Sequence, residues 1–180
     1  MHRSALAVAM SFLLVACTPA PAPSAAASVP GPAGHEPGEE AAVLAATDQF
    51  MKAISANDLA GMAALQTPDG MTYVALLEDG KAPEIVGRPN AYWVDSSRAG
   101  GPPMRERYWS PTVLVRGPMA MVWAPYEFRD DGQVSHCGVD MFSFIKRDGA
   151  WRVANMMWTV EPKACAQLMP ADTAAIRPAD

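Results

Sequence analysis

Residues 132–161 contain the feature that most constrains the fold of this chain. They read GQVSHCGVDMFSFIKRDGAWRVANMMWTVE, which is two runs rich in β-branched and aromatic residues around the dipeptide Asp148-Gly149. Asp-Gly between two such runs is among the strongest short-range signals for a tight β-hairpin. A second Asp-Gly, at positions 131 and 132, joins this unit to the run at 119–129. The sequence therefore predicts an antiparallel meander of at least three strands.

The two turns fix which residues face each other, and side-chain alternation then sorts them onto two faces. The first face is almost entirely apolar and carries Cys137, Val139, Met141, Ser143 and Ile145 beside Ala154, Met156, Trp158 and Val160. Tyr126, Ala124 and Val122 belong to the same face. The second face mixes aromatic and polar residues, namely His136, Asp140, Phe142 and Phe144 beside Trp151, Asn155, Thr159 and Glu161. We expect helices to cover the apolar face.

Helical patterns precede the meander. Residues 39–56 have Val43, Phe50 and Ile54 at helical spacing, a short helix follows Asp58, and a third is expected at about 90–97. A short hairpin at 71–86 separates the second helix from the third. Helices first and strands later indicate an α+β fold, and 180 residues, half of them hydrophobic, suffice for one domain with a core, which we place at 39–168. Residues 169–180 are expected to form a loose tail.

The N-terminal residues have the pattern of a targeting sequence. Arg3 precedes an apolar run at 5–16, and this run ends in Leu14-Val15-Ala16-Cys17, which resembles the lipobox of bacterial lipoproteins. The resemblance implies that residues 1–17 are a signal peptide and that Cys17 is acylated. It also implies an envelope protein held by its lipid at a membrane, with the outer membrane facing the periplasm as the expected site. An ordinary secretory signal that happens to contain a cysteine is the alternative.

Residues 18–38 are rich in Pro and Ala and are expected to act as a tether between the anchor and the domain. In an oxidising envelope compartment, the remaining cysteines, Cys137 and Cys165, are candidates for a disulfide. The sequence leaves open whether their Cα atoms come close enough to pair.

The order of elements is similar to that of the NTF2-like cone fold, the family of SnoaL-like polyketide cyclases and ketosteroid isomerases. The residues that carry the resemblance are those at 49–59 in the first helix, Gly87-Arg88-Pro89 before the third helix, and the hairpin from Gly132 to Trp158. The resemblance covers about residues 39–161 and implies three N-terminal helices packed on a strongly bent antiparallel sheet.

Ketosteroid isomerases use a Tyr on the first helix, an Asp on the long strand and a second Asp as base. The corresponding positions here are Phe50, Met141, and Val74 or Ala75, so these three chemical groups are missing. The resemblance then implies a cone lined by Phe50, Trp93, Val139, Met141, Met156 and Trp158. From this we expect a protein that binds an apolar small molecule or acts in assembly, without catalysis, cofactor or metal.

A rival reading places Asp140 inside the cone. A one-residue bulge at Gly138 would turn the strand over, and the protein would then be a small SnoaL-type acid–base enzyme that uses Asp140 with His136 or Tyr126. A row of Glu127, His136 and Glu161 across the strands could instead form a carboxylate–imidazole cluster, although a partly exposed polar ladder is the simpler interpretation. A third reading is a structural dimer whose cone is packed shut.

The remaining expectations concern partners. The net charge is −5 and the basic residues form no run, which argues against nucleic acid. The twelve Met residues are interpreted as core filling and not as soft-metal ligands. An aromatic sheet face without helices would be buried by a second copy, so the sequence predicts a homodimer through the face that carries Trp123, Phe142, Phe144 and Trp151.

Overall fold

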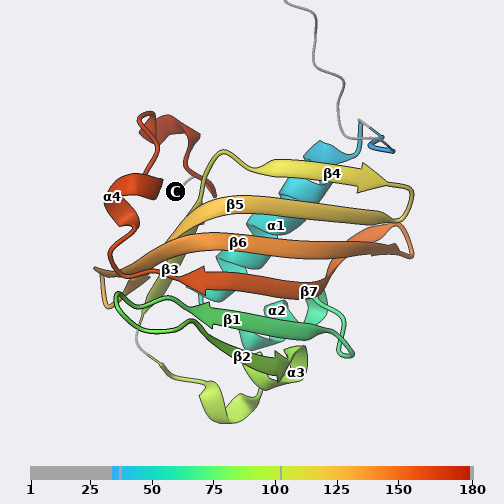
Figure 1. Cartoon of the computed structure of the whole chain (residues 1–180). Helices are drawn as coiled ribbons and strands as arrows, with labels where there is room; N and C mark the ends of the chain where they lie inside the picture. The colour runs from blue at the N-terminus through green and yellow to red at the C-terminus, as the bar shows by residue number, and fades with distance from the viewer. Residues whose placement is uncertain (1–33, 37, 102, 179–180) are drawn as a thin grey trace, which may run out of the picture. The chain divides into compact units, whose positions relative to one another are not determined.

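A computed structural model of the protein describes residues 34–36, 38–101 and 103–178 (Figure 1). The predicted signal peptide, its Cys17 and nearly all of the predicted tether lie outside these residues. Within the described part, no helix has both the length and the apolar character needed to cross a membrane.

One long helix dominates the helical part of the fold. It is α1 (Glu40–Ser55), which agrees with the expected helix at 39–56. The others are short: α2 (Leu59–Leu65), α3 (Asn90–Trp93) and α4 (Cys165–Leu168). The prediction of three packed N-terminal helices is therefore wrong in detail, because α3 is a single turn after Pro89. Acidic Glu40 in the first turn of α1 and basic Lys52 in the last turn complement the helix dipole.

The sheet has seven strands. They are β1 (Met71–Leu76), β2 (Glu84–Pro89), β3 (Met104–Tyr108), β4 (Thr112–Arg116), β5 (Met119–Asp130), β6 (Gln133–Arg147) and β7 (Ala150–Val160). Their order is β2-β1-β7-β6-β5-β3, and β4 also pairs with β5. All neighbours are antiparallel except β1 and β7, which run parallel. The expected antiparallel sheet is thus a mixed one.

Both Asp-Gly turns form as expected. Asp131 and Gly132 have φ of 47° and 74°, and Asp148 and Gly149 have φ of 51° and 79°. Two consecutive residues with positive φ define the turn whose twist matches that of the flanking strands, and Asp-Gly is a preferred pair for it. The β5–β6–β7 meander predicted from these dipeptides is confirmed.

The faces of β6 are reversed relative to the sequence prediction. In β6, Val134 pairs with Arg129 and His136 with Phe128, so Ser135 is an extra residue without a partner. In β7, Val153 and Asn155 pair with consecutive residues of β6, so Ala154 is extra in the same way. Each bulge shifts the register by one residue, and a shift of one exchanges the two faces of a strand. Consequently β5, and β7 from Asn155 onward, face as predicted, while β6 presents its even-numbered residues to α1 and the start of β7 presents Trp151 and Val153.

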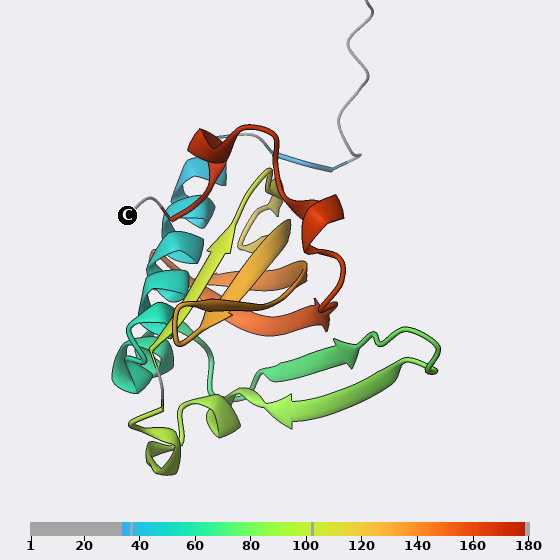
Figure 2. The same ribbon diagram turned by 90° about the vertical axis from the view of Figure 1, so that its left-hand side faces the viewer.

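The core lies between α1 and this inner face (Figures 1 and 2). Val43, Phe50 and Met51 of α1 pack with residues predicted to lie on the outside of the sheet, namely Phe142, Phe144 and Trp151, which are 4%, 1% and 6% exposed. These three residues are unavailable to a second copy. Trp123 alone of the predicted dimer face is exposed, at 49%, and it lies on the opposite side of the sheet. The homodimer remains a prediction, and the aromatic face given for it is wrong.

The C-terminal residues pack against the domain, so the predicted loose tail is also wrong for residues 169–178. Arg177 and Tyr108 exchange backbone hydrogen bonds of 2.7 Å in each direction, and the Arg177 side chain pairs with Asp48 of α1. Tyr108 donates its hydroxyl proton to Asp48 at 2.6 Å. Cys137 of β6 and Cys165 of α4 form a disulfide with a Cα–Cα distance of 5.0 Å. The segment after β7, red in Figure 2, is therefore attached to the domain near both of its ends.

Candidate functional site

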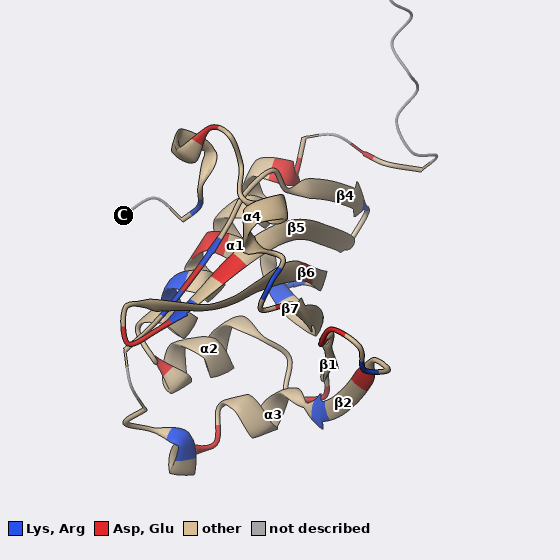
Figure 3. Ribbon diagram, turned by 60° about the vertical axis from the view of Figure 1, so that its left-hand side comes forward, with Lys and Arg blue, Asp and Glu red and all other residues tan. Residues whose placement is uncertain are grey.

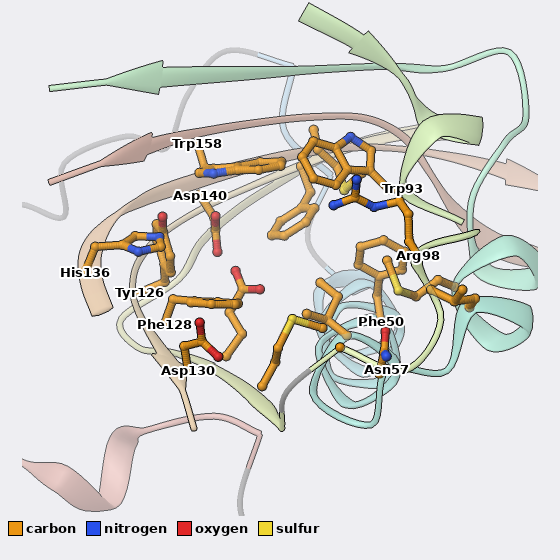
Figure 4. A pocket seen from close by; sticks show the side chains of 18 residues that line it. Phe50, Asn57, Trp93, Arg98, Tyr126, Phe128, Asp130, His136, Asp140 and Trp158 are labelled. Carbon is orange, nitrogen blue, oxygen red and sulfur yellow. The ribbon is translucent and has the colours of Figure 1, made fainter. Parts of the chain in front are cut away.

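A cavity of about 390 Å³ opens between the helices and the inner face of the sheet (Figure 4). Its wall comes from α1, α2, the segment from α3 to β3, and strands β3, β5, β6 and β7. Most of the lining is apolar or aromatic, for example Phe50, Met62, Trp93, Phe128, Met156 and Trp158. A volume above about 300 Å³ with such walls is typical of small-molecule sites.

Four of the six residues predicted to line the cone do so: Phe50, Trp93, Met156 and Trp158. Trp93 and Trp158 are in contact, with ring centroids 5.3 Å apart. The other two, Val139 and Met141, lie on the outer face because of the two bulges. Phe142, which was predicted on the outside, takes their place and meets Phe50 edge to face, with a centroid separation of 6.1 Å.

Asp140 points into the cavity (Figure 4) and is 2% exposed. The bulge at Gly138 proposed for this orientation is not formed, since Gly138 pairs regularly with Tyr126. The bulges at Ser135 and Ala154 have the same effect. Glu106 enters the cavity from β3 and is partly buried. Its backbone N–H donates to Ser55 Oγ at 3.0 Å, which ties this part of β3 to the end of α1.

Glu106 and Asp140 form a pair of interacting carboxyl groups. Burial raises the pKa of Asp140 well above its usual range, and the charge of Glu106 and a hydrogen bond to it raise this pKa further. Burial also raises the pKa of Glu106, to about 7, while the hydrogen bond with Asp140 acts in the opposite direction. Asp140 Oδ2 meets no donor among the described residues. Two carboxylates offer each other only acceptors, so we assign a proton at neutral pH to Asp140, the more deeply buried group.

Gly138 allows Thr159 and Tyr126 to approach β6 closely. It lies between His136 and Asp140 on the inner face, and a Cβ atom at this position would be 2.0 Å from Thr159 O and 2.8 Å from the ring of Tyr126. The ring of Tyr126 can therefore lie over the strand only because residue 138 has no side chain.

Tyr126, predicted as a partner of Asp140, is close to it but is already engaged. Its hydroxyl donates to Thr159 O at 2.7 Å. Burial raises the pKa of Tyr126, and the charges of Asp140, Glu106 and Glu161 raise it further. The hydroxyl therefore stays neutral, and its proton is held by the backbone.

His136 also lines the cavity, at the end nearest Tyr126 (Figure 4). Its ring stacks on Phe128 with centroids 5.2 Å apart, and Nδ1 is 3.1 Å from Ser135 Oγ. Burial lowers the pKa of His136, which favours a neutral imidazole at pH 7.

The row of Glu127, His136 and Glu161 does not form. Glu127 lies on the outer face opposite Cys137 and pairs with Arg107 and Arg129 at 2.6 and 2.7 Å. Within the described ranges, no group of three or more His, Cys, Asp or Glu side chains is arranged to hold a metal ion.

Glu106 was missed by the sequence analysis, although a signal for it exists. Met104, Glu106 and Tyr108 alternate along β3, so they share one face, and an aromatic residue such as Tyr108 normally faces the core. Its proximity to Asp140 has no local signal, because β5 separates β3 from β6 in the sheet.

No protein-family model matches the amino-acid sequence, and no curated protein matches it significantly. Solved structures do match the fold. An NTF2-like protein of unknown function from Pseudomonas putida is 17% identical with a TM-score of 0.55, and the match covers 70% of this chain and 89% of that one.

Two further matches have a described role. The β subunit of a proposed aromatic-ring-hydroxylating dioxygenase from Novosphingobium aromaticivorans is 16% identical, with a TM-score of 0.55 over 67% of this chain and 88% of its own. A proposed dehydratase of the NTF2-like family from Streptomyces avermitilis is 16% identical, with a TM-score of 0.51, and the match covers 67% of this chain and 94% of that one. At these identities the likeness shows the fold alone: the chain has the NTF2-like α+β fold with a curved sheet.

Proposed function

We propose that the protein binds an apolar small molecule in its cone and transfers a proton on that molecule with the Glu106–Asp140 pair. The observation that carries this proposal is the pair itself: two carboxyl groups of unequal burial meet at the wall of an aromatic cavity. Pairs of titratable groups whose pKa values are perturbed at a cavity are a recurring sign of acid–base chemistry.

The two carboxyl groups have different roles in this proposal. Glu106, with a pKa of about 7, exists partly as a carboxylate at neutral pH and can accept a proton from carbon next to a carbonyl. Asp140 keeps its proton and donates a hydrogen bond to the oxygen on which negative charge develops. The aromatic wall excludes water, and this strengthens both interactions. Proton abstraction next to a carbonyl is thus the reaction class that the site supports best.

This proposal reverses the expectation of a protein without catalysis, which depended on Asp140 facing outward. Binding without chemistry is the alternative, because the same aromatic wall would suit a carrier. Among the neighbours in fold, one is a subunit of a proposed dioxygenase and another a proposed dehydratase, so the fold itself is compatible with both functions.

The test is deuterium exchange into 4-phenyl-2-butanone, an apolar aromatic ketone, followed by proton NMR in D2O. The wild-type protein is expected to accelerate the loss of the proton signals from the carbon atoms next to the carbonyl of the ketone. Glu106→Gln removes the base and should lower this rate by roughly 10²- to 10⁴-fold. Glu84→Gln, at an exposed position on β2, serves as the control and should leave the rate unchanged.

Saturation-transfer NMR shows whether the ketone binds. A ketone that binds but exchanges its protons no faster than in buffer would contradict catalysis and support the alternative, a carrier that binds without chemistry. Exchange that survives in Glu106→Gln would remove Glu106 from its proposed role.

We further propose that the domain is attached to a membrane of the cell envelope through Cys17. This rests on the lipobox-like Leu14-Val15-Ala16-Cys17 and on the apolar run before it. Metabolic labelling with palmitate should mark the wild-type protein and fail to mark Cys17→Ser, and equal labelling of both would contradict the anchor.

A further inference from the structure

The rim of the cavity carries one basic residue. Among the described residues that line the cavity, Arg98 is the only Lys or Arg, whereas Glu106, Asp130 and Asp140 bring carboxyl groups. Arg98 belongs to the short turn Ser96–Arg98 that follows α3, where Figure 3 shows a basic residue beside an acidic one. Arg98 is exposed, and Figure 4 shows its guanidinium group beside Trp93 among the side chains that line the cavity.

The guanidinium is held by aromatic rings and leaves its donors unused. Its central carbon lies 4.6 Å from the ring centroid of Tyr92 and 5.2 Å from that of Trp93. The acidic neighbour Asp95 accepts a hydrogen bond from Ser97 N at 2.8 Å and caps the turn. Within the described part of the chain, Arg98 has no ion pair within 4.0 Å and donates no hydrogen bond, although its charge helps to lower the pKa of Asp95. Stacking fixes the plane of the group while its N–H edge stays free.

Trp93, whose ring contacts the guanidinium, also has an unused donor. The Nε1 atom of Trp93 is buried and has no hydrogen-bond partner among the described residues. Buried donors are normally satisfied, so this indole N–H is a further donor of the lining that protein groups leave unused.

We propose that Arg98 binds a carboxylate of the ligand, so that the ligand class is an amphipathic anion with an apolar body and an acidic end. Arg presents parallel N–H donors that match the two oxygens of a carboxylate. The opposite orientation is unfavourable, because a ligand carboxylate beside Glu106, which is partly ionised at neutral pH, would be repelled. The ligand is therefore oriented with its acid at the rim, its body along Trp93, Trp158 and Phe50, and its reacting group at the carboxyl pair. This orientation rests on the proposed function of the cavity.

Arg88 provides a matched control. Its guanidinium lies 5.5 Å from the centroid of Tyr92, but Arg88 is not part of the cavity lining and donates to Gly87 O at 2.9 Å. A substitution at this position removes an equal charge and a longer contact with the same Tyr92 ring, without touching the cavity lining.

The test compares two fluorescent probes with the same aromatic body, neutral N-phenyl-1-naphthylamine and its anionic 8-sulfonate, with the full-length protein. The wild-type protein is expected to bind the anionic probe more tightly. Arg98→Gln should lower the affinity for the anionic probe by roughly ten- to a hundredfold, the loss expected for a charge-assisted contact. It should change the affinity for the neutral probe by less than about twofold. Arg98→Lys should restore part of the affinity, and Arg88→Gln should change neither probe.

The possible outcomes separate this inference from the proposed function. If the wild-type protein binds neither probe, the ligand cavity itself is refuted and Arg98 loses its role with it. If both probes bind equally, or if Arg98→Gln weakens both to the same extent, the anion site alone is refuted and the proton-transfer proposal stands. An equal effect of Arg88→Gln would show that the net charge of the surface, and not the rim, attracts the anion.

Discussion

The pH dependence of folding gives a direct test of the Glu106 environment through the substitution Glu106→Gln. The pKa of Glu106 rises from 4.5 to about 7 on folding. The folded protein therefore keeps a proton that the unfolded chain releases between these pH values. Because stability falls with rising pH wherever the folded state binds more protons, this group destabilises the protein as pH rises from about 4.5 to about 7.

The size of the effect follows from the shift. One pKa unit corresponds to about 1.4 kcal/mol, so the full shift corresponds to about 3 kcal/mol. Glu106 is partly exposed to solvent, which screens its charge and reduces the expected value to about 1–3 kcal/mol. Glutamine is neutral at every pH and fills nearly the same volume. Relative to the wild-type protein, Glu106→Gln should therefore become more stable by this amount between pH 4.5 and pH 8.

The assay is urea unfolding followed by tryptophan fluorescence at several pH values, since the free energy of unfolding extrapolates linearly with denaturant. Glu84→Gln is the control and should follow the wild-type curve. The free energy of unfolding is then compared as a function of pH. If it changes with pH in the same way in the wild-type protein and in Glu106→Gln, the reasoning is refuted, because Glu106 then binds the same number of protons in the folded and unfolded states.

The other predictions concern the faces of the sheet and its fastening. Trp158→Ala should weaken binding of the neutral naphthylamine probe by roughly tenfold or more. Met141→Asp, on the outer face, should leave this binding unchanged. Loss of binding in Met141→Asp would show that β6 faces as the sequence alone predicts. Gly138→Ala should lower the free energy of unfolding by about 1–3 kcal/mol or more in urea titrations, because its Cβ would collide with Thr159 O, and a neutral result would contradict the close approach. Cys165→Ser should lower it by about 2–4 kcal/mol, and a variant as stable as the oxidised wild type would show that the disulfide adds nothing.

The sequence was sufficient where a local pattern determined the structure. The Asp-Gly dipeptides required positive φ at both residues and so located the turns of the meander. Helical spacing of Val43 and Phe50 located α1 to within one residue at each end. These features depend on residues that are adjacent or one helical turn apart.

The site was harder to predict because its geometry depends on residues that are distant in sequence. An extra residue at Ser135 and another at Ala154 reverse β6, and neither serine nor alanine signals a bulge. The orientation of Asp140 therefore followed from packing, since α1 buries Phe142 and Phe144 on the same face. The parallel pairing of β1 with β7 likewise has no local signal.

The proposed proton transfer requires above all that Asp140 is protonated at neutral pH. Carbon-13 NMR of carboxyl carbons, assigned by comparison with Asp140→Asn and Glu106→Gln, measures it directly. We expect the Asp140 carboxyl to remain protonated at pH 7 while Glu106 is near the midpoint of its titration. Titration of both groups near their ordinary values of 3.8 and 4.5 would contradict the account.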